Sequence, residues 1–374
     1  MHKKSVLLLI LSVCILFMSS CTHASDNPFT AAGQKNDSLT ILSDYKDDIR
    51  LCVSVASSLF KTEHEGVTIS SYPGFTREEL LDDRNFEIFL EKLAAEMMAG
   101  KGPDIFIFDF TDLFGSELYK KMDSGAFYDL NILIDYDKDF DMSLFEEKVL
   151  DAGLYRGKRY SMPISYNVPV FFTTQDKLDS YDISLEDLMT YEGLLGGIKD
   201  IQEKDGYCSD GLLSTYCYGW FNEYLDFDEG KASLSNPTFS LLMDVSRSDY
   251  MQNTNRSVYT ISYHDDFMYT DNQVLYESLF PGMSALFLNA SVKDETPPEI
   301  LTVSNAYGNT TAYVYYYILV SSSTENLKNA WDYINIFLGE KIQGNVLKLM
   351  SSSAGVRTEF IDTTIDFISK ECIR

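Results

Sequence analysis

The sequence predicts an α/β protein in which strands and helices alternate. Short apolar runs are separated by amphipathic segments in the first third of the chain. One of these runs, Ile105 to Phe108, is apolar at every position, as expected of a parallel strand that is covered on both faces. The 374 residues also suffice for two domains of about 150 residues, each with its own core.

The elements follow one another in the order expected of βαβ units. The segment from Phe86 to Met97 repeats apolar residues every three or four positions, which predicts an amphipathic helix, and Gly100 closes it. Such units place ligand-binding groups after the carboxyl ends of their strands. The predicted elements are a strand at 39–42, a helix at 49–60, a strand at 67–69, a helix at 86–97 and a strand at 105–108.

The composition excludes nucleic acid as a partner. The chain has 30 Lys and Arg against 57 Asp and Glu, a net charge of −27, whereas phosphate binding draws its affinity from basic side chains. The 25 Tyr and 24 Phe contrast with only 2 Trp. A surplus of Tyr fits a wet binding surface or, as the plainer interpretation, additional core and surface residues.

The N-terminal segment is predicted to lie outside the fold. Residues 1–20 combine an early pair of lysines with an apolar run that is too short to span a membrane, which is typical of a secretory signal. Their ending, Met18-Ser19-Ser20-Cys21, resembles the bacterial lipobox, so we expect Cys21 to be lipidated and the chain to be anchored outside the cell membrane. An uncleaved N-terminal anchor is the alternative. Residues 21–37 are polar and without period, which predicts a flexible tether.

Two cysteines lie close together in the middle of the chain. An exported protein can form disulfides, and Cys208 and Cys217 are the best-placed pair. Free buried thiols are an equal alternative for these two residues.

Five sequence blocks, in the same order along the chain, resemble the extracellular solute-binding proteins of ABC importers. The first, GKGPD followed by IFIF, also has a physical account: Gly100 ends a helix, Pro103 prevents its continuation and Asp104 can accept hydrogen bonds from nearby backbone N–H groups. In the last block, the spacing of apolar residues predicts a helix over 327–338 with Trp331 in the core, Thr324 as its N-cap and Gly339 as its end. The blocks lie at 100–108, 127–130, 155–164, 227–239 and 316–343.

The resemblance implies a periplasmic-binding-protein-like fold, in which two α/β lobes enclose a ligand cleft and several hinge crossings join them. The crossings are expected near Pro163 to Val168, Leu301 to Tyr307 and Ser351 to Gly355. Only 17 residues follow Arg357, where relatives continue with several helices, so either the second lobe is trimmed or the sequence is incomplete. The expected division is 38–163 plus 302–352 for the first lobe and 164–301 plus 353–374 for the second.

Candidate ligand-binding residues follow the predicted strands or lie at the crossings. A sugar needs aromatic faces for its C–H surfaces and carboxylate or amide groups for its hydroxyls. No aromatic residue stands at Asn289, where relatives carry one, which weakens the carbohydrate interpretation, and Arg357 would suit a carboxylate ligand. For each position the plain alternative is a solvated turn, a helix cap or a buried element. The candidates are Asp44, Tyr45, Phe108, Asp109, Asp112, Tyr166, Asn167, Tyr218, Trp220, Asn289, Tyr307 and Arg357.

Enzyme classes fit the sequence poorly. It contains no His-Glu-x-x-His or Cys-x-x-Cys arrangement, so we expect no metal, and nothing indicates another cofactor. Acid pairs such as Asp47-Asp48 are expected to be solvated, although a glycosidase would use two carboxylates.

The sequence therefore predicts a non-catalytic, lipid-anchored protein that captures a small solute and delivers it to an ABC permease. The favoured solute is an oligosaccharide. The alternatives are a peptide or another non-sugar solute, and a surface protein that keeps the fold but no longer serves uptake. A surface-exposed glycosidase-like enzyme is the least favoured alternative.

Overall fold

The computed structural model describes most of the chain between residues 27 and 357. The described ranges are 27–31, 33–44, 46–73, 83–109, 113–114, 117–204, 207–208, 224–226, 229–255, 273–280, 299–302, 309–346 and 354–357.

The first part of the chain forms the predicted α/β arrangement. Strands β1 (Ser38–Ser43), β2 (Thr68–Ser71) and β3 (Ile105–Phe108) are parallel, with β1 in the middle. Helix α2 (Asp47–Glu63) connects β1 to β2, and α4 (Asp83–Met98) precedes β3. All four residues of β3 are buried, which confirms the prediction of a strand covered on both faces.

Most of the remaining strands extend this sheet, whereas β4 with β5 and β8 with β9 form two small sheets of their own. The remaining elements are η1 (Pro28–Thr30), α5 (Leu118–Asp123), α6 (Asn131–Tyr136), η3 (Met142–Leu144), α7 (Glu147–Leu150), η4 (Asp151–Gly153), β4 (Leu154–Tyr155), β5 (Lys158–Arg159), β6 (Ser161–Thr173), α8 (Gln175–Ser180), η5 (Glu186–Met189), α9 (Tyr191–Glu203), β7 (Tyr207–Cys208), β8 (Leu225–Asp226), β9 (Lys231–Ala232), α12 (Pro237–Asn255), β10 (Gln273–Phe280), β11 (Glu299–Thr302), β12 (Tyr313–Val320), α14 (Leu327–Leu338), the π-helix η6 (Lys341–Val346) and β13 (Ala354–Gly355).

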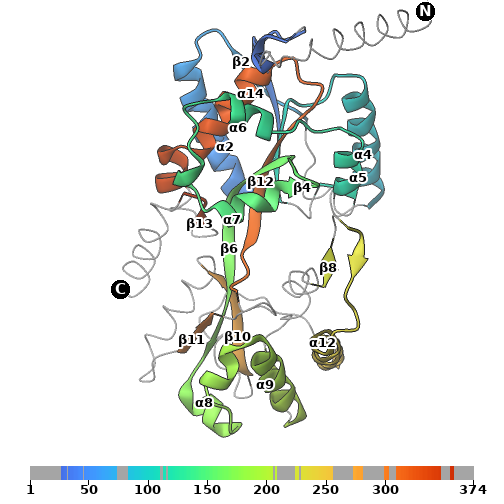
Figure 1. Ribbon diagram of the computed structural model, residues 1–374, viewed down its shortest axis with the longest axis vertical. Helices are drawn as coiled ribbons and strands as arrows, with labels where there is room; N and C mark the ends of the chain where they lie inside the picture. Colours follow the sequence, from blue (N-terminus) through green and yellow to red (C-terminus); the bar gives the residue numbers. More distant parts are fainter. Residues whose placement is uncertain are drawn as a thin grey trace, which may run out of the picture.

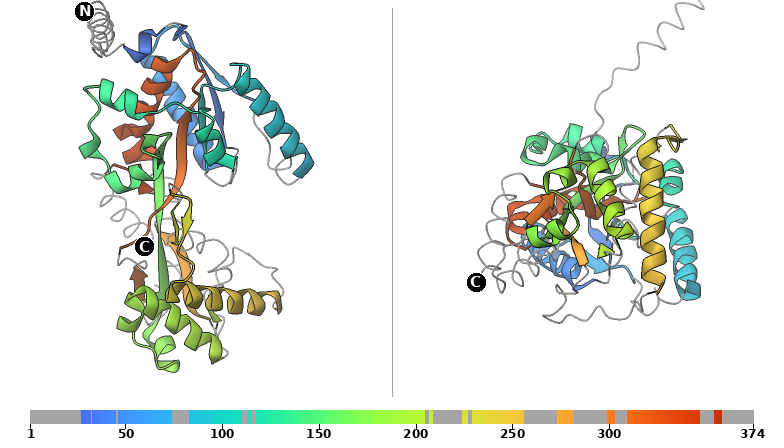
Figure 2. Two further views of the ribbon diagram at one scale, coloured as in Figure 1. Left: turned by 45° about the vertical axis from the view of Figure 1, so that its right-hand side comes forward. Right: turned by 90° about the horizontal axis from the view of Figure 1, so that it is seen from below.

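Strand β6 connects two groups of elements. Its first half pairs with β12 up to Asn167, and its second half pairs with β10 from Val168 onwards, both antiparallel. Figure 1 shows β6 running from the upper group, which contains β1, β3 and β12, to the lower group with α8, α9 and β10. Figure 2 shows the same division from two other sides. The change of partner falls in the segment where the sequence analysis expected the first crossing.

The described residues form three apolar clusters. Because side chains alternate along a strand, Ile105 and Ile107 face the cluster beneath α2 and α14, whereas Phe106 and Phe108 face a second cluster together with Leu93 of α4. The third cluster gathers Phe171 of β6, the apolar face of α9 and residues of α12, β10 and β11. The upper group therefore has apolar packing on both faces of its sheet, and the lower group has a cluster of its own.

Two boundary segments can be placed against these clusters. Leu301 lies in the third cluster, with the elements expected in the second lobe. Val356 is buried in the first cluster, and its carbonyl oxygen accepts the backbone N–H of Glu146 at 2.8 Å. Residues 354–357 thus contact first-lobe elements, although the sequence analysis assigned them to the second lobe.

Helix α14 spans the predicted residues, but it begins differently. Trp331 is 1% exposed and its indole N–H donates to Oδ2 of Asp137 at 2.6 Å, which confirms its place in the core. Gly339 is the C-cap, as predicted. The prediction that Thr324 is the N-cap is wrong, because Asn326 occupies that position and the Thr324 hydroxyl donates to Asp104 instead.

Candidate functional site

Two predicted carboxylates meet at the carboxyl ends of β1 and β3. Asp44 directly follows β1 and Asp109 directly follows β3, and these strands are adjacent and parallel. The ammonium group of Lys46 lies between them, with Nζ 3.6 Å from Oδ2 of Asp44 and 3.4 Å from Oδ2 of Asp109. The parallel sheet thus gathers one positive and two negative groups at one edge. We call Asp44, Lys46 and Asp109 the strand-end triad.

The position of Asp44 is fixed by backbone hydrogen bonds. Its own N–H donates to the carbonyl oxygen of Ile107 at 2.9 Å, which continues the pairing of β1 with β3 by one residue. Its Oδ1 accepts the backbone N–H of Lys46 at 3.2 Å. The Asp44 side chain is buried, and the nearby Lys46 ammonium compensates a charge that would otherwise be expensive to bury.

The Lys46 and Asp109 side chains remain partly accessible. Their side chains are 27% and 18% exposed, whereas that of Asp44 is 0% exposed. Lys46 and Asp109 thus keep part of their side-chain surface accessible to solvent, whereas Asp44 keeps none. Charged groups that are partly shielded from water form stronger hydrogen bonds than neutral ones.

Tyrosines of β12 border the triad. Nζ of Lys46 lies 5.7 Å from the ring centroid of Tyr315, and this half-buried ring packs edge-on against Tyr316 at 4.6 Å. Tyr317, paired with Phe108 in the sheet, is buried. Burial raises the pKa of its hydroxyl, with smaller contributions from Tyr119 and Asp109. The Tyr317 hydroxyl therefore stays protonated and can donate a hydrogen bond.

The crossing strand contributes buried polar groups. Met162, Ile164 and Tyr166 face the first apolar cluster, so Ser165 and Asn167 face the other side of β6. Ser165 Oγ and Asn167 Oδ1 are buried and make no hydrogen bond in the described part of the chain. Buried polar atoms of this kind are rare in proteins and usually have a water or ligand partner. Asn167 also stands directly opposite Tyr313 of β12.

Three predicted ligand contacts are placed elsewhere. Phe108 is 2% exposed and packs edge-on against Phe106 and Phe114, so its ring is part of the core. Tyr166 is buried in the first cluster, where burial, with Glu146 nearby, raises its pKa to about 12. Arg357 lies over the ring of Phe145 and donates to the carbonyl oxygen of Leu338, at the end of α14.

The other candidates lie outside the described residues. They are Tyr45, Asp112, Tyr218, Trp220, Asn289 and Tyr307, and the side chains of the Cys208–Cys217 pair are likewise not described. Sequence reasoning missed Lys46 and Tyr315. A lysine three residues after a strand and a tyrosine in the run Tyr-Val-Tyr-Tyr-Tyr carry no signal that separates them from ordinary surface residues.

Comparison with known proteins decides the family. The profile of the bacterial extracellular solute-binding protein family matches residues 85–370. The chain belongs to this family. No curated protein sequence is similar enough to the chain to be matched.

Solved structures show the same fold. The sugar-binding protein MalE from Xanthomonas citri is 12% identical, with a TM-score of 0.65, and the match covers 90% of this chain and 85% of that one. An ABC substrate-binding protein from Listeria monocytogenes, solved with cycloalternan, is 14% identical with a TM-score of 0.59, covering 90% and 83%. A cyclic α-maltosyl-1,6-maltose binding protein from Arthrobacter globiformis is 15% identical with a TM-score of 0.59, covering 90% and 85%. These matches support the periplasmic-binding-protein-like α/β fold of this solute-binding protein.

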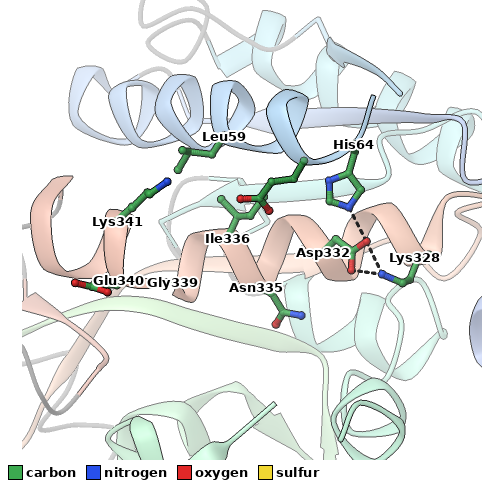
Figure 3. Close-up of a pocket in the computed structure, with 10 residues that line it drawn as sticks. Leu59, His64, Lys328, Asp332, Asn335, Ile336, Gly339, Glu340 and Lys341 are labelled. Atoms are coloured by element: carbon green, nitrogen blue, oxygen red, sulfur yellow. Dashed lines mark hydrogen bonds and ion pairs between the residues drawn. The ribbon is translucent and has the colours of Figure 1, made fainter. Parts of the chain in front are cut away.

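A polar groove lies between α2 and α14. It has a volume of about 470 Å³, and Figure 3 shows His64 and Lys328 both pointing at Asp332. His64 Nε2 lies 2.9 Å from Asp332 Oδ2, and its ring stacks on Phe60 at 4.0 Å. The groove lies between two helices and not at the carboxyl ends of the strands, where α/β sheets present their ligand-binding groups.

The described part of the chain holds neither a candidate metal site nor a helix able to span a membrane. Among the residues that the structure describes, no group of three His, Cys, Asp or Glu side chains could hold a metal ion. Within the same ranges, no helix combines the length and apolar character needed to cross a membrane.

Proposed function

We propose that this solute-binding protein captures an oligosaccharide between two lobes and delivers it to an ABC permease without acting on it chemically. The observation that carries the proposal is the strand-end triad beside Tyr315. It combines charged hydrogen-bonding groups with an aromatic ring at the edge where α/β sheets present their ligand-binding residues.

The triad suits a hydroxyl-rich neutral ligand. Asp109 can accept hydrogen bonds from sugar hydroxyls, Lys46 can donate to them and the Tyr315 ring can cover a C–H face. Two carboxylates with one ammonium leave the triad negative, which opposes an anionic ligand. The sugar-binding proteins among the solved relatives support the same ligand class.

The lobes are proposed to be 38–163 plus 302–352 and 164–301, with β6 as the first hinge, and residues 354–357 are proposed to belong to the first lobe, against which they pack. Binding favours a closed form only through contacts with both lobes. The triad would supply the first-lobe contacts. Asn167 and Ser165, on the strand that changes partners, would gain hydrogen-bond partners when the ligand arrives.

The location of the protein is also part of the proposal. Lipidation of Cys21 would hold the mature chain at the outer face of the cell membrane, next to its permease. The extracellular family and the lipobox-like Met18–Cys21 support this location.

Titration of the purified mature protein with oligosaccharides and peptides tests the ligand class. A true ligand at a hundredfold excess over its dissociation constant should stabilise the protein by about 2.7 kcal/mol. Asp109→Asn should weaken sugar binding about tenfold or more, because it removes a charged acceptor. Asp135→Asn, an exposed acid on α6, is the matched control and should bind normally. Binding of peptides but of no sugar would overturn the oligosaccharide proposal, and hydrolysis of any compound would overturn the non-catalytic role.

A further inference from the structure

Part of the predicted tether lies against the fold. Residues 27–31 and 33–37 run beside the start of α14, where Figure 1 shows them in dark blue at the upper end of the molecule. Lys35 N–H donates to the carbonyl oxygen of Glu325, and Gln34 Nε2 donates to that of Thr324 at 2.9 Å. We call residues 27–31 and 33–37 the docked arm.

The arm caps α14 from outside the helix. The N-cap residue Asn326 makes no side-chain cap of its own. Instead Oε1 of Gln34 accepts the N–H of Leu327 at 2.8 Å, and Oδ1 of Asn36 accepts the N–H of Lys328 at 2.9 Å. The first N–H groups of a helix have no partner within it, so each of these contacts satisfies a group that needs one.

The start of α14 also accepts hydrogen bonds from the arm. Oδ1 of Asn326 accepts the backbone N–H groups of Asp37 and Ser38, both at 3.3 Å, where the arm enters β1. Asn326 Nδ2 in turn donates to Oδ1 of Asp104. The arm is therefore connected to the buried aspartate of the Gly-Pro-Asp turn through a single side chain.

The arm has a defined conformation of its own. Asn36 adopts a left-handed backbone with φ of 54°, which Asn tolerates better than other non-glycine residues, and Gly33 has φ of 96°. Asn36 Nδ2 donates to the carbonyl oxygen of Phe29 at 3.3 Å. The Phe29 ring packs edge-on against Tyr136 of α6 at 5.5 Å, and Lys328 Nζ lies 5.6 Å from its centroid.

We propose that the docked arm shortens the membrane tether and holds the α14 and α6 end of the first lobe close to the bilayer surface. The inference rests on the proposed lipidation of Cys21. If all of 21–37 were flexible, the chain could extend about 55 Å from the lipid, at up to about 3.5 Å per residue. With the arm docked, only the steps from Cys21 to Asn27 remain, and the limit falls to about 20 Å.

Hydrogen exchange of the soluble mature protein tests the docking itself. In the double variant Gln34→Ala/Asn36→Ala, the amides of Leu327 and Lys328 should exchange about fivefold faster or more, since each loses its cap. Lys35→Ala is the matched control: it lies between the two residues and removes only an exposed ion pair with Glu325. Equal exchange in wild type and double variant would overturn the docking.

Energy transfer on vesicles tests the shortened tether. A lipid thioester ligated to the N-terminal cysteine anchors the mature chain at Cys21 whether or not the cell lipidates it, and the vesicles carry an acceptor-labelled lipid. A donor dye at position 132 on α6 should transfer strongly in wild type and in Lys35→Ala, and at least twofold less in the double variant. Equal transfer in all three would overturn the proposal. Mass spectrometry of protein extracted from cell membranes separately reports whether Cys21 is lipidated.

Discussion

The Thr324 hydroxyl donates a hydrogen bond to the carboxylate of Asp104, although 220 positions separate the two residues. The other carboxylate oxygen of Asp104 accepts the backbone N–H of Thr40 in β1 at 2.7 Å. Asp104, which is 7% exposed, thus connects β1, the entry to β3 and the start of α14. The Gly-Pro-Asp turn serves as a tertiary junction, beyond its role in ending a helix.

Replacement of Asp104 should therefore destabilise the protein strongly. Asp104→Ala leaves the Thr40 N–H and the Thr324 hydroxyl without an acceptor in a buried site, and we expect the free energy of unfolding to fall by about 2–4 kcal/mol. Urea unfolding monitored by circular dichroism measures the loss. Asp135→Ala, at an exposed acid, should change stability by less than about 0.5 kcal/mol. An equally small change for Asp104→Ala would contradict the role of Asp104 as a tertiary junction.

Local patterns were sufficient to predict two of the regular elements, β3 and α14, residue by residue. The four residues of β3 and the twelve of α14 have the predicted bounds, because an all-apolar run and a strict helical spacing leave few alternatives. The docked arm could not be predicted in this way. Gln34 and Asn36 act only where α14 begins, about 290 positions further along, and a polar segment without period looks flexible until its partner is known.

The candidate site could likewise be predicted only in part. Asp44 and Asp109 were predictable because parallel strands end at one edge. Lys46, which bridges them, has no distinguishing pattern. Phe108 was assigned to the ligand by resemblance, yet the period of two along β3 places it on the same face as Phe106, and that face is core.

Phe108 should accordingly contribute to stability and not to binding. Phe108→Leu keeps an apolar side chain but loses edge-on contacts with Phe106 and Phe114, so we expect a loss of about 1–2 kcal/mol in unfolding free energy. Solute affinity should stay within about twofold of wild type, as calorimetric titration would show. A tenfold loss of affinity with unchanged stability would return Phe108 to the binding site.

The protein should lose stability when the indole N–H of Trp331 is removed. Trp331→Phe keeps an aromatic ring in the core but leaves Oδ2 of Asp137 without its indole donor, which predicts a loss of about 1–3 kcal/mol. Asp137→Asn tests the same contact from the other side. If the two changes act through one hydrogen bond, the double variant should lose clearly less than the sum of the two single losses. Additive losses would argue that each residue acts separately.

Ionisation of the buried Tyr166 should lower the stability of the protein at alkaline pH. Burial raises its pKa from 10.0 to about 12, so between these values the unfolded chain releases a proton that the folded protein keeps. The contribution is complete below pH 10 and is lost as pH rises towards 12, at up to about 1.4 kcal/mol per pH unit. The free energy of unfolding should therefore fall less between pH 9 and about pH 11.5 in Tyr166→Phe than in wild type.

Lys46 and Asp109 should be energetically coupled in the unliganded protein. Their charged atoms lie 3.4 Å apart and both side chains are partly shielded from water, which predicts a coupling of about 1 kcal/mol in a double-mutant cycle with Lys46→Met and Asp109→Asn. Asp44 lies on the other side of Lys46, so Lys46→Met alone should destabilise more than Asp109→Asn alone, because it leaves a buried carboxylate without its nearby cation. Coupling that vanishes at saturating solute would indicate that the ligand takes over these hydrogen bonds. Additivity of the two substitutions without ligand would show that the triad does not act as a unit.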